Sequence, residues 1–367
     1  MKKILSVFGT RPEAIKMAPV VKELESREGI ESIVCVTAQH RDMLDQVLDV
    51  FNIKPDYDLN IMKPGQTLAY ITAEVLKGIE EIIIKEKPDL VLVHGDTTTA
   101  MAAALAAFYQ QVSVGHVEAG LRTYDKYSPF PEEMNRQIID KIADYLFAPT
   151  KNSEENLGNK FNEGQKVFVT GNTAIDALKT TVSENYENNV LDWAKDSRLI
   201  LVTAHRRENL GEPMRRIFKA IRKITEEFSD VKVIYPVHLN PKVQEVAKEV
   251  FGGSEKIKLI EPLDVLDFHN FMERAYFIMS DSGGVQEEAP SLGKPVLVLR
   301  DTTERPEGIA AGTLKLVGTD LENVYREARK LLIDRDEYDK MSQAKNPYGD
   351  GFASKYIVDA IMEEKND

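Results

Sequence analysis

Apolar runs typical of buried β-strands alternate with helical segments along the whole chain. In the first half the strand candidates are Ile4–Phe8, Glu31–Thr37, Leu90–His94, Val112–Val117, Tyr145–Ala148 and Val167–Thr170. The second half restarts with Leu199–Thr203 and continues through Val231–Pro236, Ile257–Ile260, Tyr276–Ser280, Pro295–Leu299 and Leu314–Val317. Apolar, β-branched strands separated by helices predict parallel sheets covered on both faces. The two runs therefore predict an α/β fold with two doubly wound, Rossmann-like domains.

The domain boundaries follow from where these runs stop and restart. A chain of 367 residues has room for two or three domains of ordinary size. The polar stretch 180–195 separates the runs, and we expect a first domain over 1–171 and a second over 172–352. The last helical segment, Ser354–Glu364, is expected to cross back, so that 353–367 completes the first domain. Open parallel sheets bind ligands at the carboxyl ends of their strands, which predicts a site in an interdomain cleft.

Charge and cysteine content exclude several classes of protein. With 47 Lys and Arg against 60 Asp and Glu, the net charge of −13 argues against non-specific binding to nucleic acid or to an anionic membrane. The one cysteine, Cys35, lies in a strand candidate, so a disulfide framework is impossible and a buried thiol is expected. The N-terminal apolar run leads into Thr10-Arg11-Pro12-Glu13 rather than a signal-peptide cleavage site. No run approaches the roughly 20 residues of a membrane span, and we expect a cytoplasmic protein.

Cofactor motifs are absent from the sequence. The six histidines form no HExxH motif, the single cysteine excludes CxxC, and no metal-ligand spacing recurs. No GxGxxG motif follows the first strand candidate, which leaves a nicotinamide site poorly supported. No Walker motif is present, which argues against nucleotide hydrolysis. The sequence therefore predicts neither a metal nor an organic cofactor.

The segment Asp281–Ala289 gives the most specific indication of a ligand. Ser282, Gly283 and Gly284 stand between a strand candidate and a short helical run. Backbone N–H groups and the positive end of a helix dipole favour a phosphate at such a turn, and glycines let the backbone approach it. Glu288 lies one turn after Gly284 on the same side, where its carboxylate can accept both hydroxyls of a ribose. This spacing predicts a nucleotide; an ordinary strand–turn–helix corner without a ligand is the alternative.

In the first half, each polar cluster follows a strand candidate. Arg11 and Lys16 follow the first strand and could reach a diphosphate, although a solvated first helical turn also explains them. Asp96 could serve catalysis or cap the helix that starts at Thr98. Glu118 ends an apolar strand, where an acid is uncommon without a partner or a function. Glu132 follows Pro131, the expected first helical residue, and an acid there also suits the helix dipole.

The second half repeats this arrangement. His205, in Ala204-His205-Arg206-Arg207-Glu208-Asn209, could donate a hydrogen bond to a phosphate, or be a satisfied histidine at a strand end. Arg305 follows another strand candidate among several hydroxyls and acids, and is a candidate clamp for a nucleotide.

Together these segments resemble the bacterial non-hydrolysing UDP-N-acetylglucosamine 2-epimerases. The resemblance covers nearly the whole chain and rests on GTRPEAIKMAPV (9–20), HGDTTT (94–99), GHVEAGLRT (115–123), PEEMNRQ (131–137), TGNTAID (170–176), TAHRREN (203–209) and DSGGVQEEAPSLGKPVLVLRDTTERPEG (281–308). It implies the two-domain GT-B architecture and interconversion of UDP-GlcNAc and UDP-ManNAc at C2. The implied route is anti elimination of UDP to 2-acetamidoglucal followed by re-addition, with no cofactor.

The resemblance also implies roles for single residues. The implied catalytic residues are Asp96, Glu118 and Glu132, at the family's acid–base positions, and His205. No acid is assigned to one face of the sugar. Arg11, Lys16, His205 and the turn Ser282-Gly283-Gly284 match positions that hold UDP and neutralise its leaving diphosphate. Glu288 matches a ribose ligand, Phe268 a neighbour of the uracil, and Arg305 a further nucleotide contact.

Regulation and assembly are further expectations from the family. Regulated members bind a second UDP-GlcNAc beside the active site, and Gln39, Arg206, Glu208 and His238 suit that site. Asp42 and Gly65 depart from the Gln and Arg expected there, and Leu263 replaces a Gln found near the uracil in some relatives. The family also implies a homodimer and a place in cell-surface polysaccharide synthesis.

Three other functions fit much of the same sequence. A hydrolysing relative would use the same acids but release UDP and free ManNAc. A GT-B glycosyltransferase would need an acceptor groove and leave C2 unchanged. A catalytically inactive UDP-sugar sensor would keep the nucleotide site, but retention of Asp96, Glu118 and Glu132 argues against it.

Overall fold

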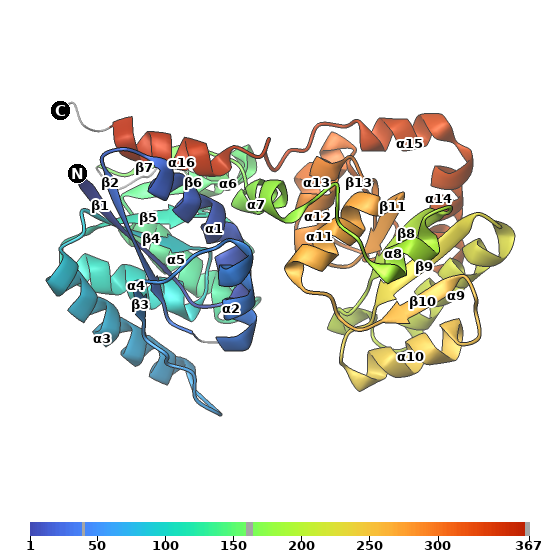
Figure 1. Ribbon diagram of the computed structural model, residues 1–367, viewed down its shortest axis with the longest axis horizontal. Coiled ribbons are helices and arrows are strands. Elements are labelled where there is room, and N and C mark those ends of the chain that lie inside the picture. The colour runs from blue at the N-terminus through green and yellow to red at the C-terminus, as the bar shows by residue number, and fades with distance from the viewer. Residues whose placement is uncertain (39–40, 159–163, 364–367) are drawn as a thin grey trace. The chain divides into compact units, whose positions relative to one another are not determined.

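The computed structural model divides into two compact α/β units. The structure describes residues 1–38, 41–158 and 164–363. The first unit comprises Met1–Ala177 and Tyr348–Asp367, and the second comprises Leu178–Pro347. Figure 1 shows that each unit is a sheet with helices around it. None of the helices in the described ranges is long and apolar enough to cross a membrane.

The first unit is built on a parallel sheet of seven strands. Its strands are β1 (Lys2–Phe8), β2 (Ile30–Val36), β3 (Tyr57–Asp58), β4 (Leu90–His94), β5 (Ser113–Val117), β6 (Tyr145–Ala148) and β7 (Lys166–Val169). They lie in the order β3-β2-β1-β4-β5-β6-β7, and each adjacent pair is parallel. Six of these strands were predicted from their apolar runs. The two-residue strand β3 was missed, since it is too short to show a period.

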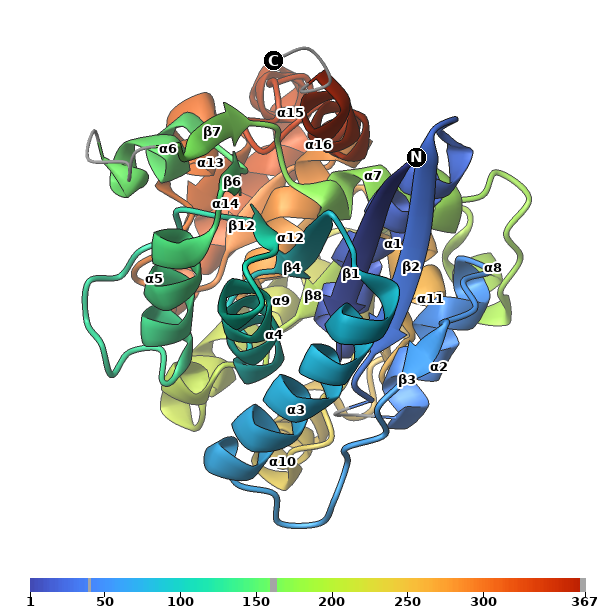
Figure 2. The same ribbon diagram turned by 90° about the vertical axis from the view of Figure 1, so that its left-hand side faces the viewer.

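Helices cover the sheet of the first unit on both faces. They are α1 (Arg11–Ser26), α2 (Arg41–Val50), α3 (Leu68–Glu86), α4 (Thr98–Tyr109), α5 (Glu132–Ile142), α6 (Lys151–Leu157) and α16 (Ala353–Met362). Helix α7 (Thr173–Thr181) begins in the first unit and ends in the second. Helices α3, α4 and α5 pack in series, as Figure 2 shows, while α1 packs against α2 and α16. The alanine-rich side of α4 and the isoleucines of α3 share one core with Leu5 and Val7 of β1.

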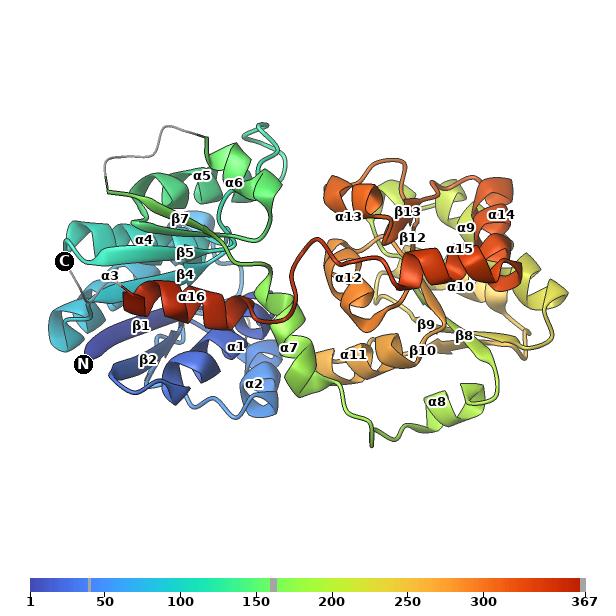
Figure 3. The same cartoon turned by 90° about the horizontal axis from the view of Figure 1, so that it is seen from above.

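The C-terminal helix α16 belongs to the first unit. Figure 3 shows α16 beside α1, although the two helices lie at opposite ends of the sequence. The carboxylate of Asp176 in α7 fixes its start, because it accepts the backbone N–H groups of Ala353 (3.1 Å) and Ser354 (2.8 Å). The structure assigns the chain from Tyr348 onward to the first unit. Glu364, the last residue of the predicted helix, lies outside the described residues.

The second unit repeats the plan with six strands. They are β8 (Arg198–Thr203), β9 (Val231–Pro236), β10 (Ile257–Ile260), β11 (Phe277–Ser280), β12 (Val296–Val298) and β13 (Leu314–Leu316), in the order β10-β9-β8-β11-β12-β13. Its helices are α8 (Asn189–Ala194), η1 (Arg207–Asn209), α9 (Glu212–Glu227), α10 (Pro241–Phe251), α11 (Val265–Arg274), α12 (Gly283–Glu288), η2 (Ala289–Leu292), α13 (Pro306–Ala311), α14 (Leu321–Ile333) and α15 (Arg335–Ser342). All its strand pairs are parallel.

Strand β8 shows why these apolar runs form sheets buried on both sides. Ile200 and Val202 face a core shared with α9, α10 and α14. Leu199 and Leu201, on the alternate positions, face a second core shared with α8 and α11. A strand between two cores needs apolar residues at every position, which is the pattern predicted to mark parallel sheets.

Candidate functional site

The predicted motifs gather at the topological switch point of each sheet. In the first sheet the order reverses between β1 and β4, so the loops after these strands diverge; in the second it reverses between β8 and β11. In open α/β sheets, ligands bind at the carboxyl ends of strands at such a point. The loops after β1 and β4 carry Arg11 and Asp96, and those after β8 and β11 carry His205 and Ser282.

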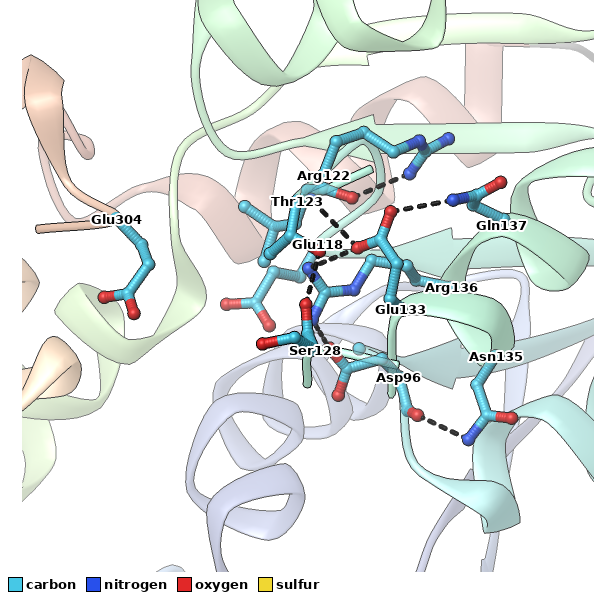
Figure 4. A network of polar contacts seen from close by, with 12 residues as sticks. Asp96, Glu118, Arg122, Thr123, Ser128, Glu133, Asn135, Arg136, Gln137 and Glu304 are labelled. Atoms are coloured by element: carbon cyan, nitrogen blue, oxygen red, sulfur yellow. Dashed lines mark hydrogen bonds and ion pairs between the residues drawn. The ribbon is translucent and has the colours of Figure 1, made fainter. Parts of the chain in front are cut away.

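Asp96 lies on the turn after β4 and is held by α5. Its Oδ2 accepts from Arg136 Nη2 at 2.5 Å, and its carbonyl oxygen accepts from Asn135 Nδ2 at 2.9 Å, as Figure 4 shows. Burial raises the pKa of Asp96, Arg136 opposes this, and the charges of Glu118 and Glu132 add to the rise. An acid whose pKa lies above its usual range suits proton transfer near neutral pH. The alternative of Asp96 as a helix cap is wrong, since Thr97 caps α4 by accepting from Ala100 N.

Glu118 follows β5 with a left-handed backbone, φ +70°. A non-glycine residue in this region is strained, and such strain persists where the surrounding structure enforces it. The carboxylate forms an ion pair with Lys16 of α1, and Oε1 also accepts from Asn172 Nδ2 at 3.2 Å. The predicted phosphate ligand Lys16 thus contacts a predicted catalytic acid. Together with Asp96 and Glu132, Glu118 forms a cluster of three acids within the first unit.

Two neighbouring acids at the start of α5 differ in their surroundings. Glu133 is buried and accepts from the backbone N–H groups of Thr123 (2.9 Å) and Tyr124 (3.1 Å), so it fixes that loop (Figure 4). Glu132 is half-buried and acts on Asp96 through its charge. The helix begins at Glu132, with Pro131 as its N-cap rather than its first residue, which corrects the predicted position by one residue.

A buried carboxylate, Glu13, joins the turns after β1 and β4. Its Oε2 accepts from the N–H groups of Gly9 (3.0 Å) and Thr10 (2.8 Å), and its Oε1 accepts from Thr97 Oγ1 (2.6 Å). Burial raises the pKa of Glu13, and these hydrogen bonds oppose the rise. Glu13 therefore ties the turn that carries Arg11 to the turn that carries Asp96. Arg11 itself is half-buried.

His94 at the end of β4 is the first unit's least expected feature. Its side chain is buried, and neither ring nitrogen has a hydrogen-bond partner within the described part of the chain. Nε2 lies 3.7 Å from Glu118 Oε2. Burial lowers the pKa of His94 to about 3, so the ring is neutral beside the acid cluster.

In the second unit, Gly283 begins α12 after the N-cap Ser282. A Cβ on Gly283 would stand 3.6 Å from Arg305 Nη2 and 3.9 Å from Arg206 Nη2, so two guanidinium groups converge on the glycine turn. Arg305 is anchored by an ion pair with the buried Glu287. Two arginines beside a glycine turn are suited to an anion of the size of a diphosphate.

Glu288 lies on the same side as Gly284, as the spacing predicted, with Oε1 3.7 Å from where a Gly284 Cβ would stand. Its Oε2 lies 3.4 Å from His269 Nε2, and Nδ1 of that ring is 2.6 Å from Thr181 Oγ1. His269, which the sequence did not point to, therefore orients the predicted ribose ligand. Phe268 on the same helix is half-buried against the core.

His205 lies on the loop after β8. Its ring stacks on that of His238, with centroids 5.4 Å apart and planes inclined by 9°. Partial desolvation by the surrounding protein lowers the pKa of His205, and the nearby Asp281 opposes this. Of the predicted regulatory residues, Arg206 and His238 lie next to His205, Glu208 pairs with Arg300, and Gln39 lies outside the described residues.

Among residues 1–38, 41–158 and 164–363, no group of three or more His, Cys, Asp or Glu side chains is arranged to hold a metal ion. The acid cluster of the first unit is instead balanced by Lys16 and Arg136.

Apart from those of α1 and the turn before it, these residues lie in a segment that matches a known family. The family model for UDP-N-acetylglucosamine 2-epimerase matches residues 22–362. The chain belongs to this family. A UDP-N-acetylglucosamine 2-epimerase of Bacillus subtilis is 64% identical over 98% of this chain and 95% of its own length. The chain also shares the two Rossmann-like domains, of GT-B type, of the solved epimerase structures.

Two solved structures have nearly the same fold as this chain. A Listeria monocytogenes protein assigned to this enzyme has a TM-score of 0.95 and 60% identity, over 100% of this chain and 98% of its own. The UDP-GlcNAc 2-epimerase of Neisseria meningitidis, crystallised with UDP-GlcNAc, has a TM-score of 0.87 and 49% identity, over 99% of this chain and 100% of its own.

The neutral His94 predicts a pH dependence of stability. Its pKa is about 3 in the folded protein against an ordinary value of 6.5, so between these values the unfolded chain binds one more proton than the folded one. The stabilisation is present above about pH 6.5 and is lost as pH falls, by up to about 1.4 kcal/mol per pH unit. His94→Gln should flatten this loss, as measured by urea midpoints at about pH 7 and about pH 5. His238→Gln, which removes an exposed ring, is the control, and equal pH dependence of His94→Gln and the unchanged protein would contradict the prediction.

Proposed function

We propose that this protein interconverts UDP-GlcNAc and UDP-ManNAc by elimination and re-addition of UDP, without net hydrolysis. The observation that carries the proposal is the cluster of Asp96, Glu118 and Glu132, in which the charges of both glutamates act on Asp96, beside Lys16. Membership of the epimerase family and the UDP-GlcNAc complex of the Neisseria enzyme support the substrate.

The cluster can supply both proton transfers of the reaction. A carboxylate removes the C2 proton, the C–H electrons form the C1=C2 bond, and the C1–O bond breaks so that UDP leaves with its electron pair. Positive charge builds on the sugar as UDP departs, and carboxylates stabilise it. UDP then returns to C1 while a second acid protonates C2 on the opposite face. Nothing is oxidised, so no redox cofactor is needed.

The second unit supplies the groups for UDP. Arg305 and Arg206 beside Gly283, together with His205, would neutralise the diphosphate as it becomes a leaving group. Glu288, oriented by His269, would accept the ribose hydroxyls, and Phe268 would lie by the uracil. Arg11 and Lys16 are the further UDP residues that the resemblance to the family implies.

We further infer the setting of the enzyme from its family. It would act in the cytoplasm as a homodimer and supply ManNAc for cell-surface polysaccharides. A second UDP-GlcNAc bound by Gln39, Arg206, Glu208 and His238 would activate it.

Incubation with UDP-GlcNAc in D2O, followed by NMR, tests the proposed reaction. We expect a mixture of UDP-GlcNAc and UDP-ManNAc with deuterium at C2, because the removed proton exchanges with solvent. Free ManNAc and UDP would instead indicate a hydrolysing enzyme, and a C2 that keeps its proton would indicate a glycosyltransferase. A reaction without enzyme controls for spontaneous exchange.

A further inference from the structure

The carboxylate of Asp281 holds the loop that carries His205. Asp281 directly follows β11 and is fully buried. Its Oδ2 accepts from the backbone N–H groups of His205 (2.9 Å) and Arg206 (2.9 Å) and from Asn209 Nδ2 (3.0 Å). Three donors on one buried oxygen fix the backbone of this loop, since breaking any of them leaves a buried polar group unsatisfied.

The other oxygen of Asp281 points at the imidazole of His205. Oδ1 is buried, has no hydrogen-bond partner among the described residues, and lies 3.6 Å from His205 Nδ1. A carboxylate oxygen can only accept a hydrogen bond, so the tautomer with a proton on Nδ1 is the one that turns a donor towards Oδ1. In that tautomer Nε2 carries a lone pair and is available to a ligand.

Desolvation and the neighbouring charges together set the pKa of His205. Desolvation lowers the pKa of His205, Asp281 raises it, and His238 and Arg206 lower it. The ring is therefore neutral at neutral pH when no ligand is bound. A diphosphate brings negative charge, which favours the imidazolium.

We propose that Asp281 is the positioning residue of His205: it holds Nδ1–H towards Oδ1, so that Nε2 takes up a proton when a nucleoside diphosphate binds and donates it in a hydrogen bond to a phosphate oxygen. The proton comes from solvent and returns there on release, so no covalent bond of the ligand changes. This inference rests on the proposed function, since the diphosphate is that of UDP. Asp281 is fully buried and acts through His205.

Titration calorimetry with UDP measures the proton directly. At about pH 7.5 the terminal phosphate of UDP, whose second pKa is about 6, is already ionised, so proton uptake reports on the protein. Two buffers of different ionisation enthalpy give the number of protons bound. We expect uptake approaching one proton in the unchanged protein and none in His205→Gln. Asp281→Asn should take up less than about a quarter of what the unchanged protein takes up.

A matched control separates this role from loop stability. Tyr235 Oη donates to the carbonyl oxygen of Ala204 at 2.6 Å, so Tyr235→Phe loosens the same loop but leaves Asp281 intact. Tyr235→Phe should keep full proton uptake. Uptake that falls as much in Tyr235→Phe as in Asp281→Asn would overturn the positioning role, as would unchanged uptake in Asp281→Asn.

The tautomer of His205 gives a second readout that needs no ligand. Nitrogen chemical shifts of the ring should show Nδ1–H in the unchanged protein and Nε2–H in Asp281→Asn, because the amide presents a donor where the carboxylate accepted. An Nε2–H tautomer in the unchanged protein overturns the inference even if the variant does not fold. Should UDP fail to bind, the proposed function fails, and the tautomer still decides the role of Asp281.

Discussion

Glu118→Gln is expected to lower kcat by about 10³-fold, within the roughly 10²- to 10⁴-fold that a proton-transfer group contributes. The amide keeps the size of the side chain and an oxygen for Asn172, but it cannot accept a proton. Lys16 loses its ionic partner, yet the UDP groups of the second unit are unchanged. UDP affinity should therefore stay within about threefold while turnover is lost. Steady-state kinetics, together with deuterium exchange at C2, measure the loss of chemistry.

Glu133→Gln is the matched control for Glu118→Gln. Glu133 is another acid of the first unit; it accepts from the N–H groups of Thr123 and Tyr124, and it reaches the cluster only through an ion pair with Arg136 at 3.4 Å. Its replacement should lower the unfolding temperature and leave kcat of the folded enzyme within about tenfold. A Glu118→Gln enzyme with full turnover would remove Glu118 from the mechanism.

The strands could be predicted because both faces of each sheet are covered. In β8, Ile200 faces one core and Leu201 the other, so the apolar run has no gaps and is visible without knowledge of the fold. The strand order was not contained in that pattern. It depends on which strands pair, and the pairing of β1 with β4 joins residues far apart in the sequence.

The candidate acids could be identified, but their partners could not. Asp96, Glu118 and Glu132 each stand in a motif beside a strand end or a helix start, where polar residues are informative. Arg136 and Asn172 contact Asp96 and Glu118 through folding alone, and no spacing in the sequence relates them. The left-handed backbone of Glu118 was also hidden, because a glutamate gives no sign of a positive φ.

Buried polar groups of the second unit were missed for a similar reason. Asp281 opens the segment that predicts a nucleotide, but no role was assigned to it, and His269 stands in a helical run that drew no attention. The roles proposed for them rest on distances of 3.6 Å to His205 and 3.4 Å to Glu288 across the fold. Such contacts are tertiary, and a single sequence contains no direct record of them.

Gly283→Ala is expected to abolish most UDP binding while leaving the fold intact. The added Cβ would lie 3.6 Å from Arg305 Nη2 and 3.9 Å from Arg206 Nη2, which are ordinary contacts, and Gly283 is a helical residue. The free energy of unfolding should change by less than about 1 kcal/mol. The methyl group would occupy the space beside both guanidinium groups where a phosphate oxygen is proposed to bind. Displacing the diphosphate by about 1 Å should weaken UDP binding about 10²-fold, as measured by calorimetry.

Gly120→Ala gives the opposite outcome and serves as the comparison for Gly283→Ala. Gly120 has φ +85°, and a Cβ there would lie 2.1 Å from the carbonyl oxygen of Ser153, so the first unit must distort. Gly120→Ala should therefore lose several kcal/mol of stability, about 3 or more, because it combines backbone strain with a clash against backbone. Gly283→Ala should keep its unfolding temperature and lose UDP. Tight UDP binding by Gly283→Ala would show that the phosphate does not approach this turn, and would place the nucleotide elsewhere than beside Arg305.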